Sequence, residues 1–423
     1  MRRSGLSYRL VVAHVKSAAT ASAPHHDKAD AVINARTDFR PIVISLMERN
    51  ATILGGQEIR WGRIVCALSS FDEAPLTILC TSSLLRSWRK YELEPPYDNL
   101  VEFSDAGLRL LTWVRAQVFA LRNIPRGSVV QLTGPGMLLL PAAVIAVLFK
   151  GVRLLTSLTT SRVLPFREER FPQKGYWMFW TALRLSHVVD ALNPKIDVTS
   201  IVDASKLYIA PCSFSDPERY RSAKCKANRV VFAGHFNWQK GSEILVEIVK
   251  RWPRESDSKL VLCGSGPFEG HLRKAAENNA NVDIKRVDDV GELLADAKVF
   301  LSLQQWDNYP SQAVLEAMLC ECCIVATDVG DTDLLVRAPW GTRLSVHASG
   351  GAYIQAALAF VRLDEETRRH AGATARAFVQ REHSRDRYLA YLRALWRAAS
   401  DGGRSEWPAA AERRTAVPSK GTS

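Results

Sequence analysis

The sequence contains no apolar stretch of the ~18–20 residues that a transmembrane helix needs. Its most apolar stretch, residues 137–149, has thirteen residues, too few at ~1.5 Å per residue to cross a hydrocarbon core of ~30 Å. We expect a buried crossover helix there, with a helix dipping into a membrane as the alternative. Any membrane role is therefore expected to be peripheral.

The cysteines lack the spacing of a metal site. Eight are scattered along the chain, and the cluster Cys320, Cys322 and Cys323 has no second cluster to complete a zinc site. We interpret them as reduced thiols in the core of a cytosolic protein. The pair Gly264 and Gly266 also lacks the third glycine of a dinucleotide fingerprint, which argues against a nicotinamide dehydrogenase.

Acidic residues are scarce in the first half of the chain. Residues 1–210 hold 26 Lys and Arg against 17 Asp and Glu, a balance of +9, whereas the whole chain has +12. Such an excess suits an anionic membrane surface, a pyrophosphate-bearing acceptor or a nucleic acid. No nucleic-acid motif accompanies the charge, so we expect no nucleic-acid partner.

The length of 423 residues suggests two domains, each with its own core. Residues 1–40 superficially look like a secretion signal, but Arg9 and His14 interrupt the apolar part, and we expect a disordered leader. The domain boundary is placed near Ser213. The predicted parts are 41–212 and 213–385, followed by a helix at 386–399 and a disordered tail at 400–423.

Residues 301–330 carry the most informative pattern. An apolar strand ends near Leu303, a polar turn follows, a helix is predicted from about Ser311 to Cys320, and a second apolar strand comes next. Pro310 suits the first helical position. The backbone of residues 309–312 is then a candidate seat for an anion at a helix N-terminus. Glu316, one turn after Gln312, can accept hydrogen bonds from hydroxyls such as those of a ribose.

Two further glycine-containing turns follow predicted strands. One strand runs into Gly234, and Lys240-Gly241 stand at the entrance of the next helix, where a cation can meet a phosphate. Near the start of the chain, Gly55-Gly56 opens a helix after the first strand, and such glycines let the backbone approach a ligand closely.

The run DNYPSQAVLEAM resembles the donor-site signature of the group 1 retaining glycosyltransferases, which have the GT-B fold. Glu316-Ala317-Met318 matches the second glutamate of that signature, while Asn308 replaces the first. The Gly234, His235, four residues, Lys240-Gly241 pattern keeps the family spacing but has histidine in place of arginine. Gly264-x-Gly266-Pro267 resembles the family's turn at the nucleotide.

The resemblance implies an α/β protein of the GT-B fold. Two Rossmann-like domains would face a central cleft, with the C-terminal helix crossing back to the first domain. It further implies a nucleotide-diphosphate sugar donor bound by the second domain and a glycan or polyprenyl-linked acceptor bound by the first. Retention of configuration and no requirement for a metal or other cofactor are also implied. The expected setting is surface polysaccharide biosynthesis in the cytoplasm, with the inner face of the membrane as a candidate location.

The resemblance also assigns the site. Asn308, Glu316 and Lys240 are the predicted catalytic residues, and the departing diphosphate is expected to meet Lys240, His235 and the helix N-terminus. The predicted donor-binding residues are Gly55, Gly56, Gly234, His235, Lys240, Gly264, Gly266, Tyr309, Pro310, Ser311, Gln312 and Glu316. The family's histidine near the sugar has no counterpart, because the corresponding strand carries Gln131.

Two other functions remain open from the sequence. A nucleotide-sugar 2-epimerase on the same fold would need acid–base carboxylates and histidines that the pattern does not identify. A catalytically degenerate relative could instead bind a nucleotide sugar as a scaffold partner, since Asn308, His235 and Gln131 each depart from the family pattern.

Overall fold

The computed structural model describes residues 40–47, 56–68, 74–93, 97–107, 109–133, 139–158, 176–192, 198, 201–287 and 289–401. These described residues belong to one compact unit. Gly55 and the predicted leader and tail lie outside the described residues. All eight cysteines are free thiols, and no described helix is long and apolar enough to cross a bilayer.

The first half of the described chain forms a seven-stranded parallel sheet in the order β3-β2-β1-β4-β5-β6-β7. The reversal of direction beside β1 is the arrangement of a Rossmann-like domain. Its strands are β1 (Ile42–Leu46), β2 (Leu76–Thr81), β3 (Leu100–Phe103), β4 (Val129–Leu132), β5 (Arg153–Leu158), β6 (Val188–Ala191) and β7 (Leu207–Ile209). Its helices are α2 (Gly56–Ala67), α3 (Ser82–Lys90), α4 (Arg109–Asn123), α5 (Leu140–Lys150) and α6 (Tyr176–Leu185), with short 3-10 turns at Tyr97–Asn99 and Ala204–Lys206.

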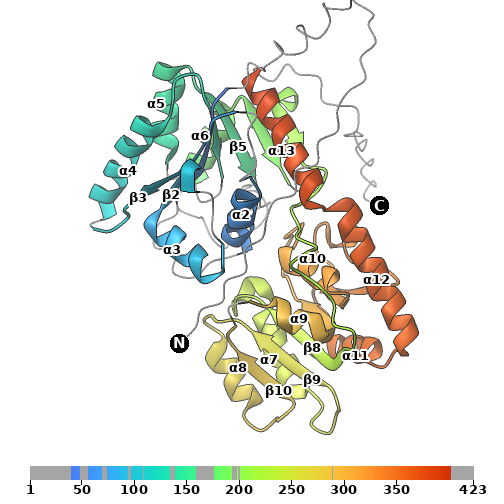
Figure 1. The fold of residues 1–423 in the computed structure, drawn as a ribbon. Helices are drawn as coiled ribbons and strands as arrows, with labels where there is room; N and C mark the ends of the chain where they lie inside the picture. The colour runs from blue at the N-terminus through green and yellow to red at the C-terminus, as the bar shows by residue number, and fades with distance from the viewer. Residues whose placement is uncertain are drawn as a thin grey trace, which may run out of the picture. The chain divides into compact units, whose positions relative to one another are not determined.

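Both faces of this sheet are covered, as its apolar strands require. Val43 packs with α4, α5 and α6 on one face. Its neighbours Ile42 and Ile44 pack with α2 and α3 on the other, because successive side chains of a strand point to opposite sides. Figure 1 shows α4 and α5 side by side at the outer edge of this half.

The prediction of a buried helix at residues 137–149 is wrong for one face of α5. Leu140, Ala142, Ala143 and Ala146 are buried against the sheet, but Leu148 and Phe149 are 71% and 74% exposed. An apolar sequence shows that a helix is able to bury its side chains. It does not show whether other elements of the fold cover each face of that helix.

The second half forms a six-stranded parallel sheet in the order β10-β9-β8-β11-β12-β13. Its strands are β8 (Ala227–Ala233), β9 (Lys259–Cys263), β10 (Val282–Lys285), β11 (Ala297–Ser302), β12 (Cys323–Thr327) and β13 (Gly341–Leu344). Its helices are α7 (Ser242–Arg251), α8 (Glu269–Ala276), α9 (Gly291–Asp296), α10 (Gln312–Leu319), α11 (Gly350–Val361) and α12 (Glu365–Glu382), with 3-10 turns η6 (Trp238–Lys240) and η7 (Thr332–Leu334). Ser213 lies in the connection between β7 and β8.

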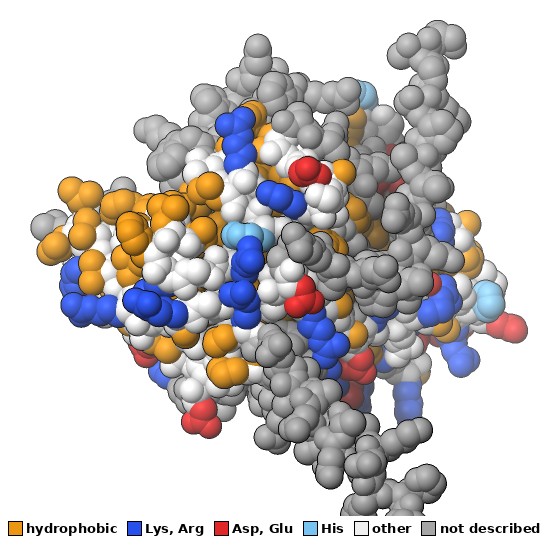
Figure 2. Space-filling model, turned by 90° about the horizontal axis from the view of Figure 1, so that it is seen from above, with side chains coloured by type: hydrophobic (Ala, Val, Ile, Leu, Met, Phe, Trp, Pro, Cys, Tyr) orange, Lys and Arg blue, Asp and Glu red, His pale blue; other side chains and the backbone are white. Residues whose placement is uncertain are grey.

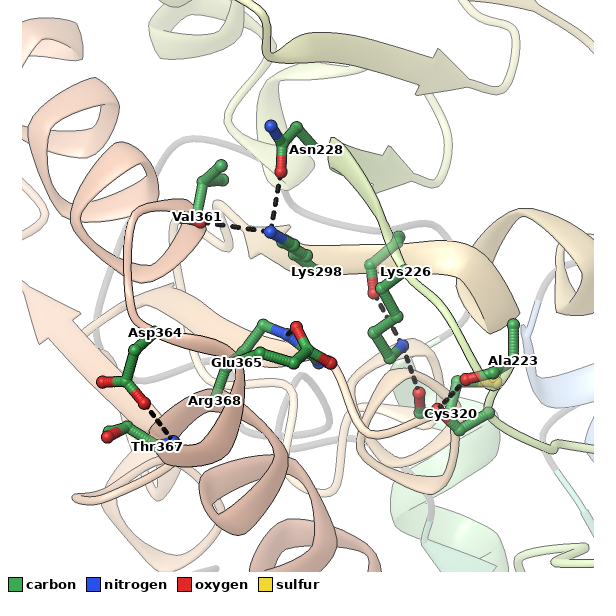
Figure 3. A network of polar contacts seen from close by, with 12 residues as sticks. Ala223, Lys226, Asn228, Lys298, Cys320, Val361, Asp364, Glu365, Thr367 and Arg368 are labelled. Carbon is green, nitrogen blue, oxygen red and sulfur yellow. Dashed lines mark hydrogen bonds and ion pairs between the residues drawn. The ribbon is translucent and has the colours of Figure 1, made fainter.

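Two lysines hold the C-terminal ends of three helices in this second half (Figure 3). The Lys226 ammonium donates to the carbonyl oxygens of Ala295 at the end of α9, at 3.1 Å, and of Cys320 after α10, at 2.6 Å. Lys298 donates to the carbonyl oxygen of Val361, the last residue of α11, at 3.4 Å. Cations suit these ends, where carbonyl groups lack helical partners. Lys226 thereby links the C-terminal ends of α9 and α10.

The last helix, α13 (Arg385–Ser400), returns to the first sheet, where it packs in the same core as β1, α2 and α3. Its Trp396 indole donates to the Gln131 side chain of β4 at 2.8 Å, and its Tyr391 hydroxyl donates to the buried Asp190 of β6. Gln131 is itself completely buried and donates to Ser157. The expected crossing helix is confirmed, and Gln131 is a structural anchor for it.

His383 occupies the junction between α12 and α13. It is 3% exposed, and its Nδ1 accepts a hydrogen bond from the backbone N–H of Ser213, in the connection between the two sheets, at 3.1 Å. An accepting Nδ1 has no proton. Burial lowers the pKa of His383 from 6.5 to about 4, because the charged imidazolium would lose its hydration.

This burial predicts an acid-sensitive junction. The folded pKa lies below the unfolded one, so the neutral form of His383 contributes its full stability above pH 6.5, and this stability is lost as the pH falls toward 4. We expect a loss on the order of 3 kcal/mol across that interval. Urea unfolding at a series of pH values should show it in the wild type and much less in His383→Asn, whose amide oxygen can still accept from Ser213. His271→Asn, on the surface of α8, serves as the control; an unchanged profile in His383→Asn would contradict the assignment.

Candidate functional site

The loops after β8 and β9 meet at the carboxyl edge of the second sheet. Gly234 directly follows β8, and a Cβ added to Gly264 after β9 would lie 1.9 Å from the Gly234 carbonyl oxygen. A Cβ on Gly266 would lie 2.5 Å from the carbonyl oxygen of Phe236. Both separations are shorter than any side chain permits, so these predicted positions admit glycine only. The carboxyl edge of a parallel sheet is where ligands of such folds bind.

The loop that carries Lys240 is joined to the loop after β11. Gly241 has φ of +71°, and a Cβ there would lie 2.1 Å from the carbonyl oxygen of Leu303. The Gln305 N–H donates to the Gln239 carbonyl at 3.1 Å. The rings of Trp238 and Trp306 add an edge-to-face contact at 4.6 Å between centroids. Lys240 and His235 are half-buried, and the Lys240 loop thus lies against the loop that leads from β11 into α10.

The N-terminus of α10 lies in this group of loops. Ser311 is its N-cap residue, and within the described part of the chain its side chain does not cap the first N–H groups of the helix. Gln312 is the first helical residue, and its Oε1 is buried without a hydrogen-bond partner in the described part of the chain. Asn308 is exposed, and the Tyr309 N–H donates to Asp307 at 3.1 Å.

The prediction that Pro310 is the first helical residue is wrong. Pro310 follows a cis peptide bond and stands two positions before α10, in the turn. The extended backbone of Ser311 then separates the turn from the helix. The rule that proline suits a first helical position cannot tell that position from a nearby turn, where its fixed φ is equally acceptable.

Glu316 is bound by a residue that the sequence analysis did not identify. Arg63 of α2 donates from Nη1 to Glu316 Oε1 at 2.6 Å and from Nη2 to the Tyr220 hydroxyl at 2.5 Å. The side chains of Arg63 and Glu316 are each 9% exposed. The guanidinium also lies 5.1 Å from the centre of the Tyr220 ring. Glu316 is thus held by a cation from the first half of the chain.

The charge state of this cluster follows from its burial and pairing. Burial alone would lower the pKa of Arg63, but the attraction of Glu316 outweighs it and raises the pKa above its ordinary value. Burial raises the pKa of Tyr220 well above its usual range, so its hydroxyl keeps its proton. Arg63 is consequently a permanent cation against a hydroxyl and a carboxylate.

Arg63 lies on the helix that begins at Gly56, the second glycine of the predicted Gly-Gly turn. Gly56 is the first residue of α2, and Arg63 follows it by seven residues, or two turns, on the same side of that helix. This spacing from Gly56 is the one feature of the sequence that could have pointed to Arg63 as a site residue. Its partner Glu316 is 253 residues away, which no local pattern can reveal.

The chemistry of the group suits an anionic ligand that also bears hydroxyls. Lys240, His235 and the N-terminus of α10 offer positive charge and N–H donors, while Glu316 and Asn308 offer acceptors. Among the described residues, no three His, Cys, Asp or Glu side chains lie together in a way that could hold a metal ion.

Comparison with known proteins gives a consistent picture. Residues 227–359 match the family model described as glycosyl transferases group 1. No curated protein matches the sequence. Among solved structures, HepE of Anabaena in complex with UDP and glucose has a TM-score of 0.65 at 13% identity, covering 84% of this chain and 98% of its own.

Two other structures are similar over the same extent. Sucrose-phosphate synthase from Thermosynechococcus elongatus has a TM-score of 0.68 at 14% identity, covering 85% of this chain and 98% of its own. A TarM mutant from S. aureus, in complex with fondaparinux, alpha-GlcNAc-glycerol and UDP, has 0.66 at 10% identity, covering 84% and 99%. At these identities the likeness shows the fold, and the predicted arrangement of two Rossmann-like halves is confirmed.

Replacing Gly241 by alanine should damage the contact between the Lys240 loop and β11. The new Cβ would collide with the Leu303 carbonyl, and the left-handed backbone is strained for alanine. We expect a loss of at least about 2 kcal/mol in the free energy of unfolding, measured in urea. Gly270→Ala is the matched control: its Cβ meets nothing within 4 Å and it lies inside helix α8, so it should stabilise by about 0.5–1 kcal/mol. Equal effects of the two changes would refute the close contact.

Removing one member of the buried Arg63–Glu316 pair should cost far more than removing a surface pair. Arg63→Met leaves a buried carboxylate without its cation, and we expect a loss of about 3 kcal/mol in unfolding free energy. The double variant Arg63→Met/Glu316→Leu should lose less than the sum of its single changes. Arg273→Met, from an exposed pair with Glu269, should lose less than about 1 kcal/mol. Additive single changes would show that the two side chains do not interact.

Proposed function

We propose that this chain, which has the GT-B fold and matches the group 1 glycosyltransferase model at residues 227–359, moves a sugar from a nucleotide-diphosphate sugar to a glycan or polyprenyl-linked acceptor. The sugar keeps its anomeric configuration in the transfer. The observation that supports the donor most strongly is the convergence of Gly234, Gly264, Lys240 and the N-terminus of α10 at one sheet edge.

The diphosphate is assigned to the positive part of this edge. When the bond between the sugar and the diphosphate breaks, negative charge grows on the departing phosphate oxygens. Lys240, His235 and the N–H groups at the start of α10 would stabilise that charge. Three such contributions make a metal unnecessary in this proposal. Asn308 would contact the sugar or the diphosphate by hydrogen bonds.

The ribose is assigned to Glu316. A carboxylate has two acceptor oxygens, and Arg63 holds one of them. The second is assigned to the ribose hydroxyls, with Arg63 fixing the orientation of the carboxylate. Arg63 therefore joins the proposed site as a positioning residue supplied by the first domain.

The acceptor is assigned to the first domain. Residues 1–210, which include this domain, carry most of the excess positive charge of the chain. A glycan intermediate of surface polysaccharide assembly, linked to a polyprenyl pyrophosphate, would meet that charge with its own phosphates. The enzyme would then work in the cytoplasm at the inner face of the membrane.

The donor proposal is tested by nucleotide binding. Thermal unfolding should be measured with UDP, GDP, ADP and dTDP, beginning with UDP because the similar HepE and TarM structures contain it. The matching nucleotide, at about 100 times its dissociation constant, should stabilise the wild type by about 2.7 kcal/mol. Lys240→Met and Glu316→Gln should lose most of this ligand-induced shift, each compared with its own unliganded state. Lys274→Met, on the surface of α8, should keep it.

The chemical step separates an enzyme from a scaffold partner. Incubation with the matching nucleotide sugar in the presence of EDTA should release nucleotide, and the anomeric coupling in the product should match that of the donor. Nucleotide binding without any turnover or hydrolysis would favour the scaffold. No shift with any of the four nucleotides would reject the donor site.

A further inference from the structure

The exposed large hydrophobic side chains of the described chain are concentrated on two helices. Ten such side chains are exposed, and eight of them lie on α4 and α5. They are Leu110, Leu111, Trp113, Val114, Val118, Ile145, Leu148 and Phe149. We call this set the α4–α5 face. Scattered single hydrophobics are ordinary on a protein surface, but a contiguous group marks an interaction site.

The spacing of these side chains makes a continuous surface. Leu110, Val114 and Val118 follow one another at four-residue intervals along one side of α4. Ile145, Leu148 and Phe149 form the corresponding stripe on α5, opposite the alanines that face the sheet. The Lys150 ammonium donates to the carbonyl oxygens of Leu121 and Ile124, so the ends of the two helices are tied together. Figure 2 shows hydrophobic side chains merged into one surface at the left, with Lys and Arg along its border.

The segment that carries this surface has charged residues of one sign in its sequence. Residues 106–158 contain six Lys or Arg and no Asp or Glu. Arg115 and Arg122 are exposed on α4, two turns apart, and so border the apolar stripe on the same side. Arg126, also exposed, follows α4. A helix with an apolar stripe and a basic border is suited to lie in the plane of a membrane interface.

We propose that the α4–α5 face docks this enzyme on a bilayer that contains anionic lipids. The apolar side chains would enter the boundary between headgroups and acyl chains, while Arg115, Arg122 and Arg126 would meet lipid phosphates. The purpose of this contact, which is to reach a lipid-linked acceptor, rests on the proposed function. The contact itself is inferred from the apolar and basic side chains of the α4–α5 face alone.

The charge pattern favours lipid over a second copy of the chain as the occupant. In a symmetric dimer the same patch meets itself, so the α4–α5 face would place arginines against arginines, with no acidic residue in 106–158 to pair with them. An anionic bilayer satisfies the apolar stripe and its basic border together.

The test is co-sedimentation of the full chain with vesicles, without donor or acceptor. Wild type should bind vesicles of phosphatidylcholine mixed with phosphatidylglycerol, bind pure phosphatidylcholine more weakly, and dissociate in about 1 M salt, where the screening length falls to about 3 Å. Arg115→Glu/Arg122→Glu should weaken binding to the mixed vesicles at least about tenfold. Leu148→Ser should weaken it about tenfold as well.

The controls use exposed residues elsewhere. Ile209→Ser removes an exposed hydrophobic of β7, and Arg254→Glu/Lys274→Glu reverses two exposed cations of the second half; both should bind vesicles as wild type does. Variants of the α4–α5 face that bind like the controls would overturn the proposal. So would a wild-type dimer, seen by sedimentation, that Leu148→Ser dissociates. The nucleotide-induced thermal shift of these variants should match the wild type, so loss of docking and loss of the donor site are observed separately.

Discussion

The approach of the strand-end loops of the second sheet to one another sets the geometry of the site. The backbone of Gly234 occupies the space where a side chain on Gly264 would lie. The backbone of Leu303 does the same at Gly241. This close packing brings the loop that bears Lys240, the turn that bears Asn308 and the first turn of α10 to one edge. At the opposite, amino-terminal edge of the sheet, Lys226 and Lys298 bind the C-terminal ends of α9, α10 and α11.

Buried polar groups link the two halves of the molecule. Arg63 from the first half binds Glu316 and Tyr220, and α13 brings Trp396 and Tyr391 to Gln131 and Asp190. Buried polar groups without partners are costly, so each of these contacts restricts the arrangements that the chain can adopt. The proposed donor site therefore includes Arg63, a residue from the half of the chain to which the acceptor is assigned.

The sequence was sufficient for features that depend on neighbouring residues. The glycine turns at Gly234 and Gly264, the helix bearing Glu316 and the stripe of α13 follow from local spacing, and the GT-B fold follows from the family pattern. The prediction that Pro310 is the first helical residue was wrong, because proline is equally acceptable in a loop turn and at the start of a helix. Arg63 was missed because its partner is distant in sequence, and the exposed side of α5 was missed because an apolar composition does not specify what covers each face.

The position of α13 has a consequence for biosynthesis. The core around β1, α2 and α3 includes Tyr388, Leu392 and Trp396, which are among the last described residues to be translated. The second sheet ends at Leu344 and has its helices by Glu382, before α13 is synthesised. Domains usually fold in the order in which they leave the ribosome. Because α13 belongs to the first core, we expect the N-terminal half to keep part of that core exposed until the C-terminal half has been translated.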